Sequence, residues 1–334
     1  MYLGREEIEM KSIWVSIPAT AAQREKMENI IASYREEWKL VFANDVSERE
    51  NQRECSRAHI IIGQPDIEQL AKNSNLEWVQ MTWAGTDKYT CQPGFPKHVQ
   101  LTNASGAFGM IMSEYAIGAI LALYRRFPQY WQQQKEHIWL DAGSEESLYG
   151  KTILLLGTGD IGSNLAKRLE VFGAYNIGVR RDASKVVEGI HEMHGFEDLD
   201  ELLARADIVA CSLPNKPQTR GLLYKERLLL MKKDAVLLNM GRGSLIDTDA
   251  LVEVLETGHL RGVVLDVMNP EPLPKEHKLW DMDRVMLTPH IAGPSIAHCE
   301  ATQDRIVDIC CENIKLYLQG KPLRNRIEEK EFEV

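Results

Sequence analysis

Three short segments of the sequence each place a charged or proton-transferring side chain just after an apolar run. Arg242 lies between two glycines in "LLNMGRGSLID", Glu271 lies in the proline-rich "GVVLDVMNPEPLP", and His290 lies in "VMLTPHIAGPS". An arginine can hold a carboxylate and a neighbouring carbonyl group by two-point hydrogen bonding. A histidine can donate a proton to that carbonyl oxygen, and a carboxylate beside the histidine favours its protonated form. The set is suited to hydride transfer onto a 2-oxo acid.

Each of these residues also has an ordinary structural explanation. Arg242 could form a surface salt bridge, Glu271 could be a turn acid, and His290 could be a hydrogen-bonded core histidine. Their shared position favours chemistry, because each follows a predicted strand, as Asp266 does at the end of "GVVLD". Ligands of doubly wound parallel sheets bind at the carboxyl ends of the strands, where these side chains can converge.

The elements that would position them alternate along the whole chain, the pattern of parallel sheets with crossover helices. In the first third, the predicted strands are "SIWVSIP", "KLVFAN", "AHIIIGQ", "LEWVQMTW" and "VQLTNA". One long helix is predicted over about 112–130, followed by the irregular "HIWLDAGSEESLYGK". Six further strands are predicted from Thr152 onward, in "TILLLG", "NIGVR", "DIVACSL", "AVLLNM", "GVVLDV" and "VMLTPH". A last helix is predicted over about 295–318, returning to the first domain.

The fold class predicted from this order is α/β, with two doubly wound domains. A length of 334 residues fits two domains. We expect a dinucleotide-binding (Rossmann) domain over 103–296, inserted in a flavodoxin-like substrate-binding domain formed by 1–102 and 297–334.

A glycine-rich turn opens the second series of strands. In "TILLLGTGDIGSNLAKRLEVFG", Gly157, Gly159 and Gly162 form G-x-G-x-x-G between an apolar strand and an amphipathic helix, the context that the motif requires. The first glycine permits a tight turn, the second lets backbone approach a pyrophosphate, and the third lets helix and strand pack closely. The following helix N-terminus offers unpaired N–H groups to the phosphates. The alternative is a glycine turn with packing duties only.

The residues about twenty positions later bear on which dinucleotide binds. NAD-binding versions place a carboxylate there, but "YNIGVRRD" ends its strand with Arg180 and Arg181. A guanidinium matches the charge and geometry of the additional phosphate of NADP. We therefore favour NADP, while Asp182 leaves NAD possible.

Composition and charge exclude several classes of function. A net charge of −10 and a pI of about 5.5 argue against a nucleic-acid surface. The longest apolar run, "AIGAILALY", is too short to span a bilayer, and the acidic "MYLGREEIEM" is not a signal peptide. Six cysteines without a CxxC pair indicate reduced thiols in a cytoplasm. "HEMH" at 191–194 lacks the metal-binding H-E-x-x-H spacing, so no metal is predicted and its histidines are read as exposed loop residues.

At this point the sequence resembles the D-isomer-specific 2-hydroxyacid dehydrogenases, from about Lys11 to the end of the last helix. The motifs that resemble the family are "GTGDIG", "CSLPNKPQTRGLL", "LLNMGRGSLIDTDAL", "GVVLDVMNPEP" and "LTPHIAG". The resemblance implies that Arg242, Glu271 and His290 are catalytic. It implies substrate binding by Trp83, Ala84, Gly85, Thr86, Arg242 and His290, with backbone N–H groups of "MTWAGTDKY" receiving the carboxylate. It also implies cofactor binding by Gly157, Thr158, Gly159, Asp160, Ile161, Gly162, Arg180, Arg181, Ser212, Leu213, Pro214, Thr219, Met240, Gly241, Asp266, His290, Ala292 and Gly293, with Asp266 at the nicotinamide end.

Within the family, "RRFPQYWQQQKEHIW" and the arginines after the second strand look most like glyoxylate/hydroxypyruvate reductases. The resemblance also implies a homodimer in which "QQQKEHIWLDAG" crosses between subunits and Trp139 reaches the partner's active site. Ordinary interface packing of Trp139 is the alternative. Asp160 departs from the usual glycine loop and would place a negative charge near the phosphates. Trp83 and Phe108 would narrow the substrate side, which suits a small 2-oxo acid.

Two other functions remain open on the sequence. The same fold could serve as a dinucleotide sensor or corepressor, although the complete set of Arg242, Glu271 and His290 argues against this. A dehydrogenase of another acid, such as formate, phosphite or 3-phosphoglycerate, is the second. The chain has no added regulatory domain, which disfavours a regulated phosphoglycerate dehydrogenase.

Overall fold

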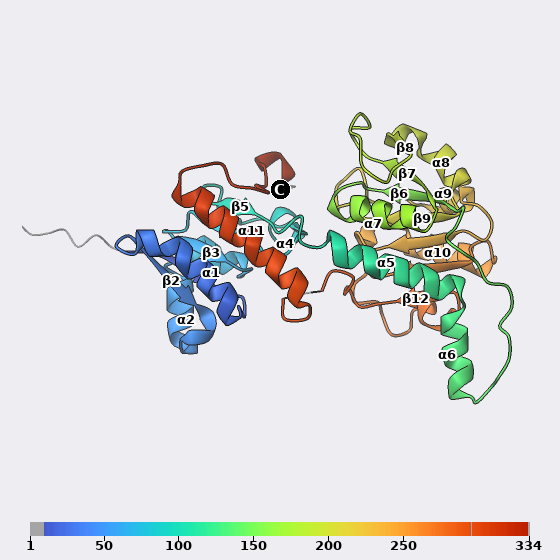
Figure 1. Cartoon of the computed structure of the whole chain (residues 1–334), viewed down its shortest axis with the longest axis horizontal. Coiled ribbons are helices and arrows are strands. Elements are labelled where there is room, and N and C mark those ends of the chain that lie inside the picture. Colours follow the sequence, from blue (N-terminus) through green and yellow to red (C-terminus); the bar gives the residue numbers. More distant parts are fainter. Residues whose placement is uncertain (1–9, 295, 333–334) are drawn as a thin grey trace, which may run out of the picture. The chain divides into compact units, whose positions relative to one another are not determined.

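The structure is a computed structural model that describes residues 10–294 and 296–332 of the chain. It divides into two compact units, which are described separately below (Figure 1). Unit 1 comprises the described residues of Met1–Ala107 and Pro294–Val334, and unit 2 comprises Phe108–Gly293.

Unit 1 is built on a parallel sheet of five strands in the order β2-β1-β3-β4-β5, which is the flavodoxin-like order. Short apolar runs form its strands: β1 (Lys11–Val15), β2 (Trp38–Phe42), β3 (Ile60–Ile62), β4 (Trp78–Gln80) and β5 (Gln100–Thr102). Its helices are α1 (Ala21–Ile31), α2 (Glu48–Cys55), α3 (Ile67–Lys72), α4 (Asp87–Thr90) and α11 (Glu300–Leu318). The last helix, α11, packs beside α1, so the C-terminal segment completes the unit that the N-terminal segment begins.

Unit 2 is built on a parallel sheet of seven strands in the order β12-β11-β10-β9-β6-β7-β8. Its strands are β6 (Thr152–Leu156), β7 (Tyr175–Val179), β8 (Glu192–His194), β9 (Ile208–Cys211), β10 (Val236–Asn239), β11 (Gly262–Leu265) and β12 (Val285–Leu287). Its helices are α5 (Gly109–Tyr124), α6 (Phe127–Lys135), α7 (Asp160–Val171), α8 (Leu199–Arg205), α9 (Lys225–Leu230) and α10 (Thr248–Glu256). Strand order reverses at β6, so the turn after β6 lies at the switch point of the sheet, where ligands of this architecture bind.

Strands β6, β7, β9, β10 and β11 of unit 2 are buried along nearly their whole length, because a parallel sheet covered by helices is buried on both faces. Their buried polar residues are Asn176 and Asn239. Leucines and valines of β6, β9, β10 and β11 form one continuous core with α8 and α10. The two parallel sheets confirm the predicted α/β class of two doubly wound domains.

Two details of unit 2 differ from the prediction. The single helix predicted over 112–130 is wrong: α5 ends at Tyr124, Arg126 adopts a left-handed backbone conformation with φ of 54°, and α6 begins at Phe127 with Pro128 in its first turn. Proline at a helix start and a left-handed residue before it both separate the two helices. In unit 1, the helix start predicted at Ser295 lies outside the described residues, and α11 begins at Glu300.

The second difference is an additional strand. The sheet has seven strands where six were predicted, because the polar segment Glu192–His194 pairs with β7 as the edge strand β8. Of the two histidines of "HEMH", His194 is therefore not an exposed loop residue, since it lies in β8 and is half-buried, whereas His191 precedes the strand and is exposed, as predicted. An edge strand is half-solvated, so it needs no apolar run.

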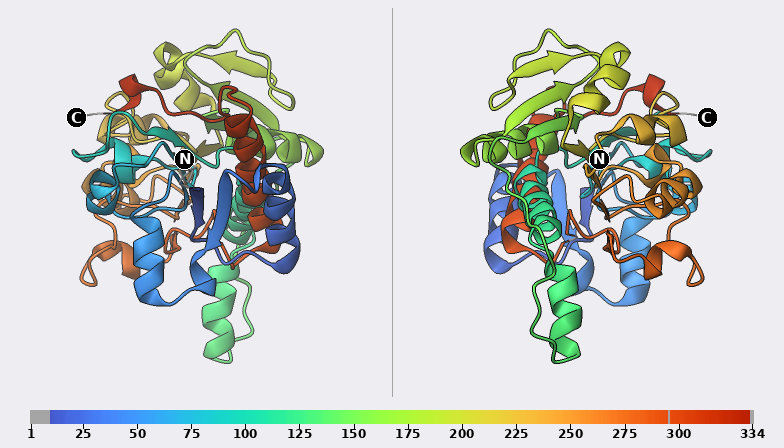
Figure 2. Two further views of the ribbon diagram at one scale, coloured as in Figure 1. Left: turned by 90° about the vertical axis from the view of Figure 1, so that its left-hand side faces the viewer. Right: turned by 90° about the vertical axis from the view of Figure 1, so that its right-hand side faces the viewer.

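Helix α6 and the irregular segment that follows it project from the rest of unit 2 (Figure 2). Across the described part of the chain, no helix combines the length and the apolar character needed to cross a membrane.

Candidate active site

The glycine loop joins β6 to α7 at the switch point of the unit 2 sheet. Gly157 has a φ of +100°, a conformation that a side chain would strain. A Cβ on Gly162 would lie 1.9 Å from the carbonyl oxygen of Gly157, so the first turn of α7 packs directly on the loop. A Cβ on Gly159 would meet nothing within 4 Å, which leaves its backbone open to a ligand. The loop thus has the geometry of a pyrophosphate cradle.

Two polar side chains of the glycine loop, those of Thr158 and Asp160, lie in different surroundings. The Thr158 side chain is buried, and its Oγ1 has no hydrogen-bond partner among the described residues. The Asp160 Oδ2 atom accepts a hydrogen bond of 2.7 Å from the Gly109 amide, which is the first amide of α5. The charge of Asp160 is therefore shared with the N-terminus of α5, where the helix dipole favours an anion.

Strand β7 ends beside the loop and places Arg180 and Arg181 after it. The Arg180 amide donates to the carbonyl oxygen of His194, which fixes the backbone at this point. Neither guanidinium has a hydrogen bond or ion pair within residues 10–294 and 296–332. Asp182 is engaged locally instead, since its Oδ1 accepts hydrogen bonds from the amide and the hydroxyl of Ser184. The hydrogen bond from Ser184 lowers the pKa of Asp182 below its usual value.

The loop after β9 forms the neighbouring rim of the same edge. Ser212 donates its hydroxyl to the carbonyl oxygen of Gly157 at 3.2 Å and so joins this loop to the glycine turn. Thr219 donates to the carbonyl oxygen of Pro214 and accepts from the Lys216 amide, which closes the turn 214–219. Leu213 is buried below it.

Arg242 follows β10 in a turn where both flanking glycines are required. A Cβ on Gly241 would lie 2.6 Å from the carbonyl oxygen of Leu213, and one on Gly243 would lie 2.0 Å from that of Met268. The buried Asn239 side chain accepts from the Gly241 amide and donates to the Arg242 carbonyl oxygen. The backbone at Arg242 is therefore held on both sides, with Met240 buried beneath it.

Asp266 ends β11 and organises the turn after β12. Its Oδ1 accepts from the Thr288 hydroxyl at 2.6 Å and from the Ile291 amide at 2.8 Å. Its Oδ2 accepts from the Ala292 amide at 2.9 Å, and its carbonyl oxygen accepts from the His290 amide at 2.9 Å. The carboxylate is 1% exposed. Asp266 is therefore the residue to which the turn 288–292 is hydrogen-bonded.

His290 projects from that turn toward Glu271. Its Nδ1 atom lies 2.7 Å from Oε1 of Glu271, and both side chains are exposed. His290 itself has a φ of 55°, a left-handed conformation that is rare for a residue with a side chain. Such strain persists only where surrounding contacts impose it, and it is concentrated at functional sites. Gly293 closes the turn, and a Cβ there would lie 3.2 Å from Sδ of Met112 on α5.

In unit 1, the segment 83–86 joins β4 to α4. The carbonyl oxygens of Trp83 and Ala84 accept from the Ala104 amide and the Asn103 side chain, which hold the segment in place. The amides of Ala84, Gly85 and Thr86 donate to no other described residue. Consecutive unpaired amides form a concave anion-binding surface.

The structure thus gathers Arg242, Glu271, His290, Asp266 and the glycine loop at one edge of the unit 2 sheet, while 83–86 belong to unit 1. Sequence reasoning missed two residues of this edge, Thr288 and Tyr115. Thr288 was visible in "LTPH", but only the fold reveals that the Tyr115 hydroxyl lies 2.6 Å from its Oγ1. Among the described residues, no group of three or more His, Cys, Asp or Glu side chains is arranged to hold a metal ion.

The comparisons with known proteins point to one family. Residues 117–292 match the family model "D-isomer specific 2-hydroxyacid dehydrogenase, NAD binding domain". A glyoxylate reductase of Thermofilum pendens is 35% identical over 77% of this chain and 76% of its own length. The chain belongs to the D-isomer-specific 2-hydroxyacid dehydrogenase family. Members of this family are oxidoreductases, and the resemblance noted in the sequence is confirmed.

Solved structures of the dehydrogenase family agree with the fold. A family member from Aeromonas salmonicida has a TM-score of 0.81 at 30% identity and covers 96% of this chain and 99% of its own. An NADPH-dependent glyoxylate/hydroxypyruvate reductase from Sinorhizobium meliloti, solved with NADP and sulfate, has a TM-score of 0.78 at 25% identity, covering 96% and 99%.

The family also includes relatives with another substrate. A D-3-phosphoglycerate dehydrogenase of Methanocaldococcus jannaschii is 34% identical over 77% of this chain. The chain spans 48% of the length of that relative.

The unit 2 residues of this dehydrogenase fit a bound nicotinamide dinucleotide. The backbone at Gly159 is open, and the buried Thr158 hydroxyl lacks a partner within the described residues. A buried hydroxyl without a partner is costly, so a ligand that hydrogen-bonds to it would stabilise the loop. The N-terminus of α7 adds a positive dipole end at the same place.

Proposed function

We propose that the protein is a reductase of small 2-oxo acids, of the glyoxylate/hydroxypyruvate type, with NADPH as the preferred electron donor. The observation that supports this most is the pairing of His290 with Glu271 at 2.7 Å, on the sheet edge that also presents Arg242 and the glycine loop. A proton donor, an anion-binding guanidinium and a dinucleotide cradle are the three parts that this reduction needs.

In this proposal the bound nicotinamide supplies the hydride. Arg242 binds the substrate carboxylate and carbonyl oxygen through its planar fork and orients the carbonyl carbon. His290 donates a proton to the carbonyl oxygen, and Glu271 orients the imidazole through the Nδ1 contact. The proton that is transferred to the substrate is therefore the one on Nε2, the ring nitrogen that faces away from Glu271.

Unit 1 is proposed to carry anion-binding groups of its own. The unpaired amides of Ala84, Gly85 and Thr86 are proposed to receive the substrate carboxylate. Trp83 is half-exposed beside them, and its bulk favours a small substituent on the 2-oxo acid. Selection against a longer substrate by such packing is worth about 1–3 kcal/mol per methylene.

NADP preference rests on the two arginines after β7. Arg180 and Arg181 have no partner within residues 10–294 and 296–332, so both are available for a phosphate on the ribose. Asp182 is tied to Ser184, which reduces its freedom to accept ribose hydroxyls in an NAD complex. Asp266 and the turn 290–293 are proposed to border the nicotinamide end of the cofactor.

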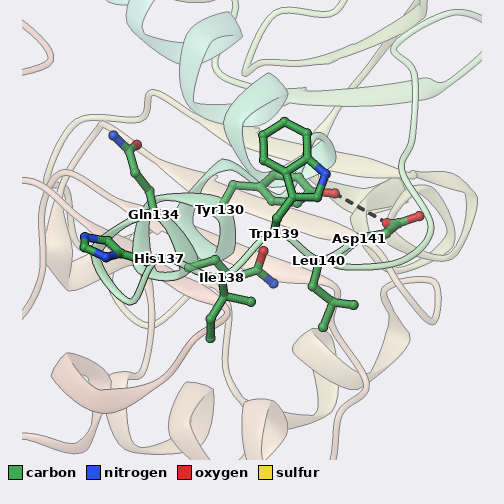
Figure 3. Close-up of a pocket in the computed structure, with 8 residues that line it drawn as sticks. Tyr130, Gln134, His137, Ile138, Trp139, Leu140 and Asp141 are labelled. Atoms are coloured by element: carbon green, nitrogen blue, oxygen red, sulfur yellow. Dashed lines mark hydrogen bonds between the residues drawn. The ribbon is translucent and has the colours of Figure 1, made fainter.

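A homodimer is part of the proposal. Helix α6 and the segment 137–141 border a hollow of about 680 Å³, and Trp139 is fully exposed beside it. Ile138 and Leu140 point away from Trp139 on the opposite side of the segment (Figure 3). Apolar side chains on both sides of a projecting segment favour burial by a second copy of this chain.

The experiment that tests the proposal is an oxidation panel. NADPH and NADH are each offered with glyoxylate, hydroxypyruvate, pyruvate and longer 2-oxo acids, and initial rates are followed by absorbance. We expect the highest kcat/KM with NADPH and a two- or three-carbon acid. Turnover of none of these acids, with intact dinucleotide binding, would favour a sensor or corepressor instead.

A second candidate is a dehydrogenase of another acid, which the 34% identical phosphoglycerate dehydrogenase supports. Adding 3-phosphohydroxypyruvate to the same panel separates the two candidates. A higher kcat/KM with this phosphorylated acid than with glyoxylate or hydroxypyruvate would replace the first proposal by the second.

A further inference from the structure

We propose that Tyr115 and Thr288 are positioning residues for His290. Their hydroxyls form a hydrogen-bond chain in which Tyr115 donates to Thr288 and Thr288 donates to the Asp266 carboxylate. That carboxylate in turn holds the strained turn on which the imidazole lies. The inference rests on the proposed function in assigning His290 as proton donor, but the chain itself is defined by contacts within unit 2.

The direction of each bond follows from proton counting. Asp266 Oδ1 is a carboxylate oxygen and can only accept, so the Thr288 hydroxyl must donate to it at 2.6 Å. The Thr288 oxygen then has only lone pairs left for Tyr115, whose hydroxyl must donate to it at 2.6 Å. The chain therefore runs from Tyr115 through Thr288 to Asp266, and every polar atom in it has a partner.

The carboxylate at the end of the chain sets the path of the backbone. The two oxygens of Asp266 accept the amides of Ile291 and Ala292, while its own carbonyl oxygen accepts the His290 amide. Three consecutive amides thus converge on one buried residue, which keeps His290 at a φ of 55°. Without these bonds the residue would relax to a common conformation and move its imidazole away from Glu271.

Helix α5 is the fixed support of the chain. Tyr115 lies on this helix, where burial raises the pKa of its phenol to about 12, so the hydroxyl keeps its proton at any working pH. One and two turns earlier, Met112 and the N-cap residue Phe108 lie against Gly293 at the other end of the catalytic turn. The turn is therefore held by hydrogen bonding at Thr288 and by packing at Gly293, both from α5.

The test compares three variants with the wild type. Tyr115→Phe removes only the donor of the first bond, and Thr288→Val removes the middle of the chain. Thr288→Ser retains the hydroxyl. We expect kcat to fall about two- to tenfold in Tyr115→Phe, the usual worth of one hydrogen bond. Thr288→Val leaves the Tyr115 hydroxyl without an acceptor and removes one of the two hydrogen bonds to Asp266 Oδ1, so a fall on the order of ten- to a hundredfold is expected. Thr288→Ser should regain kcat to within about twofold.

Two readouts separate positioning from loss of structure. The dissociation constant of NADPH, measured by fluorescence, should change less than kcat in every variant, because the hydrogen-bond chain reaches only the nicotinamide end of the proposed cofactor site and does not touch the glycine loop. Tyr124→Phe is the matched control, since it removes a tyrosine hydroxyl from the same helix, and no described residue hydrogen-bonds to that hydroxyl. Its kcat should equal that of the wild type.

A measurement independent of turnover completes the design. The His290 ring resonances, identified by their loss in His290→Gln and recorded by nitrogen-15 NMR, should shift in Tyr115→Phe and Thr288→Val and return in Thr288→Ser. Unchanged kcat and unchanged ring resonances in Tyr115→Phe would overturn the proposal, as would equal damage from serine and valine. If the wild type reduces no 2-oxo acid, the proposed function fails, and the ring resonances alone then decide whether the chain positions His290.

Discussion

The imidazole of His290 and the carboxylate of Glu271 come from different turns, yet Nδ1 and Oε1 lie 2.7 Å apart. This contact engages Nδ1 and leaves Nε2 as the nitrogen that we propose faces the substrate. His290→Gln should lower kcat by roughly 10²–10⁴-fold, the usual worth of general acid–base catalysis. NADPH binding, measured by fluorescence, should be retained. His98→Gln is the control, because His98 is exposed and lies in unit 1. Near-normal turnover of His290→Gln would end the assignment of this residue as the acid.

The same contact predicts an effect of Glu271→Gln on turnover. The Oε1 atom of Glu271 holds the orientation of the imidazole through Nδ1, and a glutamine side chain can present its amide nitrogen at that place instead. We expect kcat to fall about two- to tenfold, the usual worth of one hydrogen bond. NADPH binding, measured by fluorescence, should be retained. Turnover equal to that of the wild type would contradict this.

The cofactor preference is predicted to depend on Arg180. A charged hydrogen bond contributes about 1.5–3 kcal/mol, and 1.4 kcal/mol is a factor of ten. NADPH should therefore be preferred over NADH by on the order of ten- to a hundredfold in kcat/KM for one good contact. Arg180→Asp should invert the preference, because a carboxylate accepts ribose hydroxyls and repels a phosphate.

The control for this variant is Lys185→Asp, which makes the same charge change in the loop that follows. Its effect on the NADPH to NADH ratio should be much smaller. Raised salt should also reduce the wild-type preference, since exposed charges are screened. A wild type that prefers NADH, together with Arg180→Ala leaving the ratio unchanged, would instead assign the ribose to Asp182.

The charged contacts of the edge strand β8 predict that its contribution to the stability of unit 2 depends on pH. His194 contacts Asp198 at 2.8 Å through Nδ1 and Glu192 at 3.0 Å through Nε2. These hydrogen bonds raise the pKa of His194, with Asp198 the larger cause. The hydrogen bond from Arg205 lowers the pKa of Glu192 to about 2.

The two side chains contribute to the stability of unit 2 over different ranges of pH. The contribution of His194 is complete below its unfolded pKa of 6.5 and is lost as pH rises through the higher folded value. That of Glu192 is complete above 4.5 and is lost as pH falls toward about 2. Thermal melts of wild type and His194→Gln should therefore differ most between pH 4.5 and 6.5, and the difference should shrink above pH 6.5. A difference independent of pH would show that the imidazole is not charged in the native state.

The exposed apolar side chains of the projecting segment 137–141 predict that the protein forms a homodimer. Light scattering at micromolar concentration should give a dimer, and a monomer would reject it. Trp139→Ala should raise KM for the 2-oxo acid if the indole reaches the partner's site. A Trp139→Ala dimer with unchanged KM would limit the residue to packing at the interface.

The strands of both units were predictable because β6, β9, β10 and β11 are uninterrupted apolar runs, which is the pattern of strands buried on both faces. The residues at their carboxyl ends could be placed for the same reason. Strand β8 was missed because an edge strand of Glu, Met and His has no apolar run. The break between α5 and α6 was missed because helical periodicity continues through Arg125 and Arg126, although Pro128 was a usable signal.

The Asp160 contact and the Tyr115 chain were beyond the sequence for a different reason. Each joins residues far apart in the chain, 51 positions in one case and 173 in the other. Local patterns predict elements, whereas such contacts depend on which helix packs against which loop. Only the assembled unit brings them together.

Helix α5 is bonded at its first amide to Asp160 of the glycine loop, and at Tyr115 to the turn that holds His290. Tyr115 lies six residues, about 9 Å, along the helix from Gly109. A single helix therefore sets the spacing between the glycine loop, where we propose that the phosphates bind, and the turn that carries the proposed proton donor. Because the glycine loop and the turn of His290 are bonded to the same helix, a substitution that shifts or rotates α5 would displace both. Such a substitution would alter none of the groups proposed to touch a ligand.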